Sequence, residues 1–371
     1  MSLSASPIEA RRETWTRTLR ELGAKPLALK PNFTEVAARW EAWWTCENDQ
    51  PLMVAAAAKP SKIRWGKAFY LLEKPREWLE VRREQVENTH WAGDAIPNVR
   101  VDLGPVSTAA YLGAPLSLSE EEQTTWQTPT IEDWGRPPSF EFDPGNRWFR
   151  AAVELAKLTA EDARGRYVVC LPDLTGAMDV LSNMRGPDRL CMDLLENGAT
   201  VVAAAAKAVN AWERAFAGFH DAILGAGAGV IQWLGCWSPV PYTLPTCDFN
   251  SMISPSQFAQ FCLPSLREQA RRAGRCVFHL DGPGASRHAA ALAAEPRITA
   301  VQYTPGAGTP SALAKLEMFK MLQAAKKPLV VSAPAEEIPE LLRKLDHRGL
   351  CIGAGGVKSP AHADELAAMC R

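Results

Sequence analysis

A repeating order of segments constrains the fold of this chain more than any other feature. A short apolar run is followed by a polar or Gly/Pro-rich exit and then by a stretch of helical character. Eight such runs have the length and composition of strands. They are Pro51–Ala57, Ala95–Leu103, Tyr167–Leu171, Val230–Leu234, Cys276–Leu280, Ile298–Tyr303, Pro328–Ala333 and Leu350–Ala354. The helical segments between the later runs include Pro255–Ala273, Ser311–Ala325 and Glu336–Leu345.

Strands that alternate with helices imply right-handed βαβ units and a parallel sheet. Eight units over 371 residues predict an α/β fold, specifically a (β/α)8 TIM barrel. A doubly wound open sheet is the alternative. No G-x-G-x-x-G follows the first strand, so nothing in the sequence supports the dinucleotide site typical of that alternative.

Two segments extend the predicted barrel. Residues 1–50 have helical character and form an N-terminal helical extension, while residues 51–371 form a single barrel domain. Three tryptophans of the extension are expected to pack against the barrel: Trp40, Trp43 and Trp44. The segment Ser107–Arg147, after the second strand, is too long for an ordinary βα loop. Such an insertion is commonly a lid or an interface element.

The composition is that of an ordinary globular protein, with 47% hydrophobic and 22% charged residues. A net charge of −1 gives no electrostatic reason to expect nucleic acid or an anionic membrane as partner. Nine cysteines without regular spacing favour reduced thiols and a cytoplasmic setting. The first residues lack the apolar core of a signal peptide, and no apolar run is long enough to span a membrane. Thirteen tryptophans favour large core aromatics over an aromatic-lined pocket.

One strand ends in residues that suggest chemistry. The run from Cys276 leads through His279 and Asp281 directly into Gly282-Pro283-Gly284. Side chains alternate along a strand, so His279 and Asp281 face the same side. An imidazole and a carboxylate are costly to bury unless they pair with each other, a metal or a ligand. Because active sites of parallel α/β proteins lie at the carboxyl ends of strands, we predict catalytic roles for both. A local polar pair without catalysis is the alternative.

A second carboxylate is expected on the same side of the fold. Ser254-Pro255-Ser256-Gln257 has the pattern of a capping box with proline at the first helical position. This start signal places Asp248 in the loop before a helix, at the end of the sheet where His279 and Asp281 lie. If Asp248 is close to Asp281, mutual repulsion raises one pKa and suits the pair to general acid–base work. Otherwise Asp248 is an ordinary loop carboxylate.

Other residues at or beside strand ends are candidates for binding substrate. Asp173 is either such a residue or the cap of a turn, and Gln302 and Tyr303 offer neutral donors. The remaining candidates are Asp94, Asn98, Trp237 and Arg185. No C-x-x-C or H-E-x-x-H spacing occurs, so most cysteines, including those at 236, 247 and 351, are expected to be small buried hydrophobes.

Several fragments, taken in order, resemble the uroporphyrinogen decarboxylase superfamily, which contains tetrapyrrole decarboxylases and corrinoid-linked methyltransferases. The resemblance runs from about residue 90 through most of the chain. It is carried by Gly93-Asp94-Ala95-Ile96-Pro97, Leu103-Gly104-Pro105, Met184-Arg185-Gly186, Asp248-Phe249-Asn250-Ser251-Met252-Ile253-Ser254-Pro255 with Phe258, Phe261 and Pro264, and His279-Leu280-Asp281-Gly282. It implies a (β/α)8 barrel, and dimers are frequent among proteins of this kind, so a homodimer is expected.

The sequence departs from both named activities. The arginine-bearing motif R-Q-A-G-R-Y, with which true uroporphyrinogen decarboxylases hold substrate carboxylates, is absent. The thiol methyltransferases of the superfamily bind zinc through H-x-C and a later cysteine in a glycine-rich turn. Here His279 matches the histidine and Asp281 stands at the first cysteine, while the late turn carries glycine. Cys351, on the last strand, is the one substitute. The resemblance thus implies at most a zinc site of His279, Asp281 and Cys351, harder than a thiolate site.

The resemblance to the methyltransferase branch implies methyl transfer between a small substrate and a corrinoid (cobalamin) carried by a partner protein. His279 and Asp281 would position or protonate the substrate heteroatom, with or without a metal, and Asp248 would act as acid or base. Gln302, Tyr303 and Asp173 would orient the substrate.

Three alternatives remain open. A decarboxylase of a porphyrinogen-like or smaller acid predicts cationic side chains in the pocket, with Arg185 or Arg287 as candidates. A carbohydrate-active or carbohydrate-binding barrel predicts two carboxylates about 5–10 Å apart in an open groove. The third alternative is a binding protein without catalysis, because a fold does not determine function.

Overall fold

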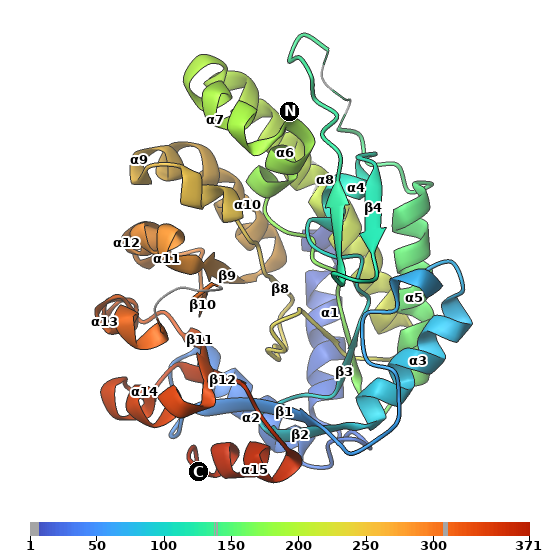
Figure 1. The fold of residues 1–371 in the computed structure, drawn as a ribbon, viewed down its shortest axis with the longest axis vertical. Helices are drawn as coiled ribbons and strands as arrows, with labels where there is room; N and C mark the ends of the chain where they lie inside the picture. The colour runs from blue at the N-terminus through green and yellow to red at the C-terminus, as the bar shows by residue number, and fades with distance from the viewer. Residues whose placement is uncertain (1–6, 137, 139, 307–310) are drawn as a thin grey trace.

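The computed structural model describes residues 7–136, 138, 140–306 and 311–371. Its strands form two main sheets and a hairpin (Figure 1). The larger sheet has the order β2 (Thr89–Gly93), β1 (Leu52–Ala58), β12 (Leu350–Gly355), β11 (Leu329–Pro334), β10 (Ala300–Thr304), β9 (Arg275–Asp281) and β8 (Tyr242–Thr243). The smaller sheet has the order β3 (Asn98–Arg100), β6 (Val168–Cys170) and β7 (Val230–Ile231), and the hairpin consists of β4 (Leu116–Ser119) and β5 (Thr124–Gln127).

Helices follow most strands. Figure 1 shows α12, α13 and α14 in a row beside β9 to β12, with α3 and α5 on the other side of the molecule, near β3. The helices are α1 (Pro7–Gly23), α2 (Phe33–Trp44), α3 (Pro75–Glu87), α4 (Ser107–Tyr111), α5 (Arg147–Ala163), α6 (Ala177–Arg185), α7 (Pro187–Glu196), α8 (Gly198–Gly225), α9 (Pro255–Gln257), α10 (Leu263–Ala273), α11 (Gly282–Ala285), α12 (Ala289–Ala294), α13 (Leu316–Ala324), α14 (Ile338–Lys344) and α15 (Pro360–Ala368). Short 3₁₀ segments are η1 (Phe69–Leu71), η2 (Asp248–Met252), η4 (Ser286–His288), η5 (Ala312–Lys315) and η6 (Ala335–Glu337), and η3 (Phe258–Cys262) is a π-helix between α9 and α10.

The α/β prediction is confirmed, and each of the eight predicted runs contains a strand. The predicted closed barrel is not seen as one continuous ladder in the described part of the chain, because the strands pair within two separate sheets. At one junction, β7 has only two residues, and side-chain bonds take the place of a ladder. The Gln232 amide donates to the Tyr242 carbonyl oxygen at 2.9 Å, and the Gln232 backbone N–H donates to the Tyr242 hydroxyl at 3.0 Å.

The other junction lies where β2 adds to the edge of β1. This strand is antiparallel to β1, with Ala55 opposite Ala92, and was missed by the sequence analysis, as were β8 and the β4–β5 hairpin. All of them are short, and β2 is half-buried and partly polar, so their sequences carry little strand periodicity. The chain therefore changes direction at Asp94 before it enters β3.

The N-terminal helices pack against the strands as expected. Trp40, Trp43 and Trp44 of α2 are all buried. Their indole N–H groups donate to the backbone oxygens of Asp94 at 3.2 Å, Leu329 at 3.2 Å and Trp237 at 2.8 Å, respectively. Buried indoles need such partners. The three bonds tie one face of α2 to three different parts of the chain.

Strands β9 to β12 run parallel and in register, so their carboxyl ends meet along one edge. His279 lies beside Gln302, and Asp281 lies beside Thr304. Helix α9 begins with the predicted capping box, in which Ser254 and Gln257 exchange hydrogen bonds. None of the helices in the described residues is long and apolar enough to cross a membrane.

Candidate functional site

The structure brings three side chains together at the carboxyl end of β9. His279 and Asp281 project from the same face of this strand, as their spacing requires. Asp248, the first residue of η2, comes from a separate loop. One ligand atom from each of the three lies within 4.8 Å of the other two. We call Asp248, His279 and Asp281 the carboxylate–histidine triad.

A single amide orients the imidazole of His279. Its Nδ1 forms a short hydrogen bond with the side-chain oxygen Oε1 of Gln302, which is fully buried. The Gln302 amide nitrogen bonds the hydroxyls of Thr304 at 2.6 Å and Ser332 at 3.1 Å, which fixes the amide orientation. An amide oxygen only accepts hydrogen bonds, so Nδ1 of His279 carries the proton. The Nε2 lone pair is therefore available to a metal or a substrate.

The indole of Trp233 forms a wall beside the imidazole. The two ring centroids are 4.9 Å apart, and the planes meet nearly at right angles. The indole also lies near Arg100, whose guanidinium carbon is 5.8 Å from the ring centroid. Trp233 and Gln302 together leave the imidazole little rotational freedom.

A buried carboxylate holds the loop that presents Asp248. Asp179, in the first turn of α6, accepts the backbone N–H groups of Asp248 at 3.0 Å and Phe249 at 3.1 Å. It also accepts the hydroxyls of Thr246 at 2.7 Å and Thr175 at 3.2 Å. The approach of the two loops requires a glycine before α6, because a Cβ on Gly176 would lie 2.4 Å from the Thr246 carbonyl oxygen.

Electrostatics at the triad favour a bound proton or cation. Asp248 is an exposed residue, but protein atoms surround its carboxyl closely enough to weaken its hydration. This enclosure, followed by the charges of Asp179, Asp281 and Asp173, raises the pKa of Asp248 to about 8. Burial lowers the pKa of His279, while Gln302 and Asp281 partly offset this effect. The imidazole is therefore a neutral ligand at neutral pH.

An open cavity adjoins this network. It has a volume of about 470 Å³ and lies over the ends of β1, β11 and β12, where its lining includes Ser332 and Gly353. Ser332 is also a partner of the Gln302 amide. A ligand in this cavity would thus contact the network that orients His279.

Two of the predicted binding residues lie in the core instead. Tyr303 follows Gln302 on β10 and points to the opposite face of the sheet, where its ring packs on Phe319 of α13 at 5.5 Å. Trp237 is buried against Phe33 of α2 at 5.0 Å. Burial and the charge of Asp281 raise the pKa of Tyr303, so its hydroxyl remains near the triad, whereas Trp237 fills space against α2.

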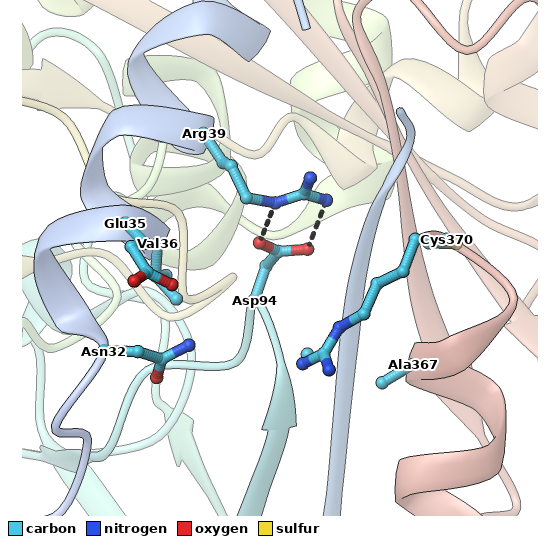
Figure 2. Close-up of a pocket in the computed structure, with 9 residues that line it drawn as sticks. Asn32, Glu35, Val36, Arg39, Asp94, Ala367 and Cys370 are labelled. Atoms are coloured by element: carbon cyan, nitrogen blue, oxygen red, sulfur yellow. Dashed lines mark hydrogen bonds and ion pairs between the residues drawn. The ribbon is translucent and has the colours of Figure 1, made fainter. Parts of the chain in front are cut away.

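Asp94 and Asn98 lie at the opposite end of the sheet. Because β2 is antiparallel, it delivers Asp94 to the start of β1, where Asp94 accepts the Met53 N–H at 2.9 Å. Arg39 of α2 donates to both oxygens of Asp94, at 2.7 and 3.1 Å (Figure 2). Asn98, at the first position of β3, bonds the Ile96 carbonyl oxygen. These two residues stabilise the fold at a distance from the triad.

The two arginines proposed for carboxylate binding are engaged elsewhere. Arg185 forms an ion pair with Asp193 at 2.7 Å and donates to backbone oxygens at residues 131 and 132. Arg287 donates to the Gly284 carbonyl oxygen at 2.7 Å, on the rim of the site. Neither guanidinium is directed at the triad.

Cys351 and Asp173 have contrasting positions. The Cys351 thiol is fully buried, which, with nearby Cys236 and Asp94, holds its pKa well above the ordinary value. The cluster of possible metal ligands in the described residues does not include it. Asp173 does lie near the triad, since its charge acts on Asp248. It accepts the Thr175 N–H at 3.0 Å, as in the predicted turn.

The sequence analysis did not identify Asp179, Arg100 or Trp233. In the sequence, Asp179 has only the features of an ordinary acidic residue in the first turn of a helix. Trp233 lies inside a predicted strand run, and Arg100 sits within the second one. A charged residue in an apolar strand run was the one available signal, because burial of an arginine requires a partner or a ligand.

Comparisons with known proteins show which fold this chain shares with a solved structure. No family model matches the sequence, and no curated protein matches it. Among solved structures, the chain is similar to a methyltransferase from Methanosarcina mazei, with a TM-score of 0.61 and 14% sequence identity. The match covers 90% of this chain and 97% of that one. At this identity the likeness shows that the two chains share a fold over nearly their whole lengths.

Proposed function

We propose that this chain is a methyltransferase that moves a methyl group between a small substrate and a corrinoid carried by a partner protein. In this proposal the two sheets are arcs of one (β/α)8 barrel, and the triad marks its catalytic end. One observation carries the proposal: an imidazole with a free Nε2 converges with two carboxylates, on a fold shared with a methyltransferase. Nine free thiols fit a reducing cytoplasm.

The donor set of the triad fits a divalent cation. Zinc accepts imidazole nitrogen and carboxylate oxygen, and a catalytic zinc site has three protein ligands and one open position. Asp248, His279 and Asp281 supply three such ligands, and Gln302 supplies the outer hydrogen bond that orients the imidazole. The close carboxylates repel each other, and a cation would relieve this repulsion.

The residues have distinct roles in the proposed reaction. A corrinoid supplies or receives the methyl group as an electrophile. His279 and Asp281 would hold the substrate heteroatom in line with the methyl group, directly or through the cation. Without the cation, Asp248 would act as the acid or base, because a pKa of about 8 suits it to exchange a proton with the heteroatom near neutral pH. Trp233 and Gln302 keep the imidazole in place. The groups around the substrate heteroatom are therefore already oriented when it reacts, and no energy is spent on moving them. Two carboxylates in place of thiolates make the site hard, which favours oxygen or nitrogen over sulfur in the substrate.

The carbohydrate alternative receives less support. The ligand oxygens of Asp248 and Asp281 lie within 4.8 Å of each other. Inverting glycosidases separate their carboxyl groups by about 6.5–9.5 Å to admit a water molecule. Retaining enzymes use about 5–5.5 Å, but His279 stands against both carboxylates here. That arrangement suits a shared cation or proton better than a nucleophile and an acid on two faces of a sugar.

Metal binding and methyl transfer test the proposal together. The protein is stripped with a chelator, loaded with Zn²⁺ or Mn²⁺, and assayed for bound metal. It is then mixed with methylcobalamin and with alcohol, amine and thiol acceptors, and demethylation is followed by absorbance. We expect one bound equivalent and transfer to at least one acceptor. His279→Ala and Asp281→Asn should abolish both, and Gln302→Leu should weaken metal binding about 10- to 100-fold.

The matched control is His347→Ala, which removes a half-exposed histidine paired with Asp346. It should bind metal and transfer methyl groups like the parent protein. The proposal fails if demethylation is absent with every acceptor class, or if the His279 and Asp281 variants retain it.

A further inference from the structure

A second polar cluster lies beside the triad and shares Trp233 with it. Its centre is Arg100, the last residue of β3. The Arg100 guanidinium carbon lies 5.8 Å from the centroid of the Trp233 indole, and the His279 ring contacts the same indole at 4.9 Å. One aromatic ring therefore contacts both this cation and the imidazole. About a quarter of the Arg100 side chain is exposed, so it reaches open space.

The hydrogen-bonding capacity of Arg100 is largely unused. Its nearest carboxylate, Asp102, is 3.7 Å from Nε, which is an ion pair but too long for a hydrogen bond. The buried Nε has no hydrogen-bond partner. A guanidinium offers five donors in a planar fork that matches a carboxylate, and a buried donor without a partner is costly. Arg185 shows the contrast, because Asp193 and two backbone oxygens occupy its fork.

Arg100 shares its nearest carboxylate with a second cation. Lys67 Nζ lies 3.5 Å from Oδ2 of Asp102, the same oxygen that pairs with Arg100, and buried Arg82 is also near. Burial alone would raise the pKa of Asp102, but Arg100, Lys67, the Gly104 N–H and Arg82 lower it below the ordinary value, so it is ionised. Arg100 also acts on the carboxyl of Asp173. Arg100 and Lys67 thus share one oxygen of Asp102, and neither has a carboxylate of its own within ion-pair distance among the described residues.

The insertion after β3 helps to form this cluster. The Lys67 N–H donates to the Gln123 side chain at 2.5 Å, in the turn between β4 and β5. The Thr125 hydroxyl bonds the Leu103 carbonyl oxygen at 2.9 Å, just beyond Arg100. The hairpin therefore links the segment that carries Lys67 to the residues just beyond the carboxyl end of β3.

We propose that Arg100, with Lys67, binds a carboxylate group of the substrate while the triad binds its heteroatom. The inference rests on the proposed function and deepens it by naming the substrate class: a small acid with an oxygen or nitrogen nucleophile at its other end. Two cations that share one carboxylate oxygen attract a further carboxylate group. The planar fork of Arg100 favours the same group.

Calorimetric titration with matched probes tests the inference. Succinic monohydroxamic acid carries a metal-binding hydroxamate and a carboxylate, and its terminal amide replaces the carboxylate with a neutral group of the same shape. We expect the acid to bind the metal-loaded protein about tenfold or more tightly than the amide. Arg100→Met should remove this difference without changing the affinity for the amide, and Arg100→Lys should retain part of it. Arg287→Met, on the rim, is the control and should change neither affinity.

The same comparison on the metal-free protein separates the two proposals. Removal of the metal should reduce the affinities for the acid and for the amide by the same factor. Loss of the Arg100 site should instead remove only the tighter binding of the acid. Equal affinities for acid and amide in the parent protein, with or without metal, would overturn the inference and leave the methyltransferase proposal standing. Equal losses for both probes in Arg100→Met would overturn it as well, because they indicate a structural role. Tighter binding of 3-phosphonopropionohydroxamic acid than of succinic monohydroxamic acid would overturn the carboxylate assignment, because it would show that the Arg100 site prefers a phosphate-like group.

Discussion

At the scale of single residues, Gln302 has the largest effect on the chemistry available to the triad. Histidine ligands in metal sites often donate their second N–H to a carboxylate, which raises the basicity of the ring. Here the acceptor is a neutral amide, held in turn by the Thr304 and Ser332 hydroxyls. The imidazole of His279 is consequently fixed in direction but not made strongly basic. This arrangement suits a ligand that stays neutral throughout a reaction.

Asp173 should make the stability of the protein depend on pH. Burial raises its pKa from 3.8 to about 6, with Arg100 and the Thr175 N–H opposing this shift and Asp179 and Asp102 adding to it. Between about pH 4 and pH 6 the folded state binds the proton more tightly than the unfolded state, so the contribution of Asp173 to stability falls as pH rises through this window. Asp173→Asn removes this loss.

The measurement is urea unfolding of both proteins at about pH 4.5 and pH 7. The free energy of unfolding of Asp173→Asn, relative to the parent, should increase by at most about 3 kcal/mol between the two conditions. Other carboxylates titrate in both proteins and cancel in the difference. A relative stability that does not vary with pH would show that Asp173 is ionised in the fold without penalty.

At the scale of elements, the site depends on a link between the first turn of α6 and the start of η2. Asp179 accepts two backbone N–H groups from this loop, at Asp248 and Phe249. Without them, η2 has no side-chain cap at its first residue. The position of Asp248 is therefore determined by a carboxylate almost seventy residues earlier in the chain.

Substitution of Asp179 should loosen this link. Hydrogen bonds to a charged group contribute about 1.5–3 kcal/mol each, so Asp179→Ala should strongly destabilise the loop. The amides of Asp248 and Phe249 should then exchange hydrogen much faster, as measured by mass spectrometry or NMR, and Asp179→Asn should show a smaller effect. Asp188→Asn is the matched control, because Asp188 is an exposed acid in the first turn of α7. Unchanged exchange at Asp248 in Asp179→Ala would mean that other contacts hold the loop.

The part of the site that lies on β9 was predictable, and the part that depends on distant contacts was not. The position of His279 and Asp281 followed from strand alternation and the glycine break after Asp281. The capping box at Ser254 predicted that Asp248 precedes a helix, although η2 intervenes. Asp179 and Arg100 have their roles only through residues far away in the chain, and no local pattern distinguishes them. Tyr303 follows Gln302 on β10, so strand alternation already implied that their side chains point in opposite directions.

At the scale of the whole molecule, the candidate functional residues and a buried stabilising ion pair lie at opposite ends of the strands. The triad and Arg100 lie at the carboxyl ends of strands, whereas the Arg39–Asp94 pair joins α2 to the start of β1 at the opposite end. Asp94 is almost fully buried, and Arg39 is about one third exposed. The alternation of strands and helices predicted this architecture, but short strands such as β2 and β7 had too few residues to reveal their pairing.

Removal of one partner of this pair should destabilise the fold and spare the site. We expect Asp94→Asn to reduce the free energy of unfolding by about 3 kcal/mol, the lower end for a buried pair, because Arg39 is partly solvated. The change should appear in urea unfolding at neutral pH. Metal binding by the folded variant should equal that of the parent protein. A loss of metal binding would place Asp94 in communication with the triad.

The pairing of β1 with β12 has a consequence for the order of events during synthesis. Strand β1 is made long before its parallel neighbour β12, because almost three hundred residues separate them in the chain. Contacts between such distant segments form slowly and leave apolar edges open to aggregation in the meantime. The antiparallel β2 lies much nearer to β1 in the chain than β12 does, so it can pair with one edge of β1 much earlier. The other edge of the alanine-rich strand β1 stays unpaired until β12 has been made, and we expect chaperones to bind the nascent chain there.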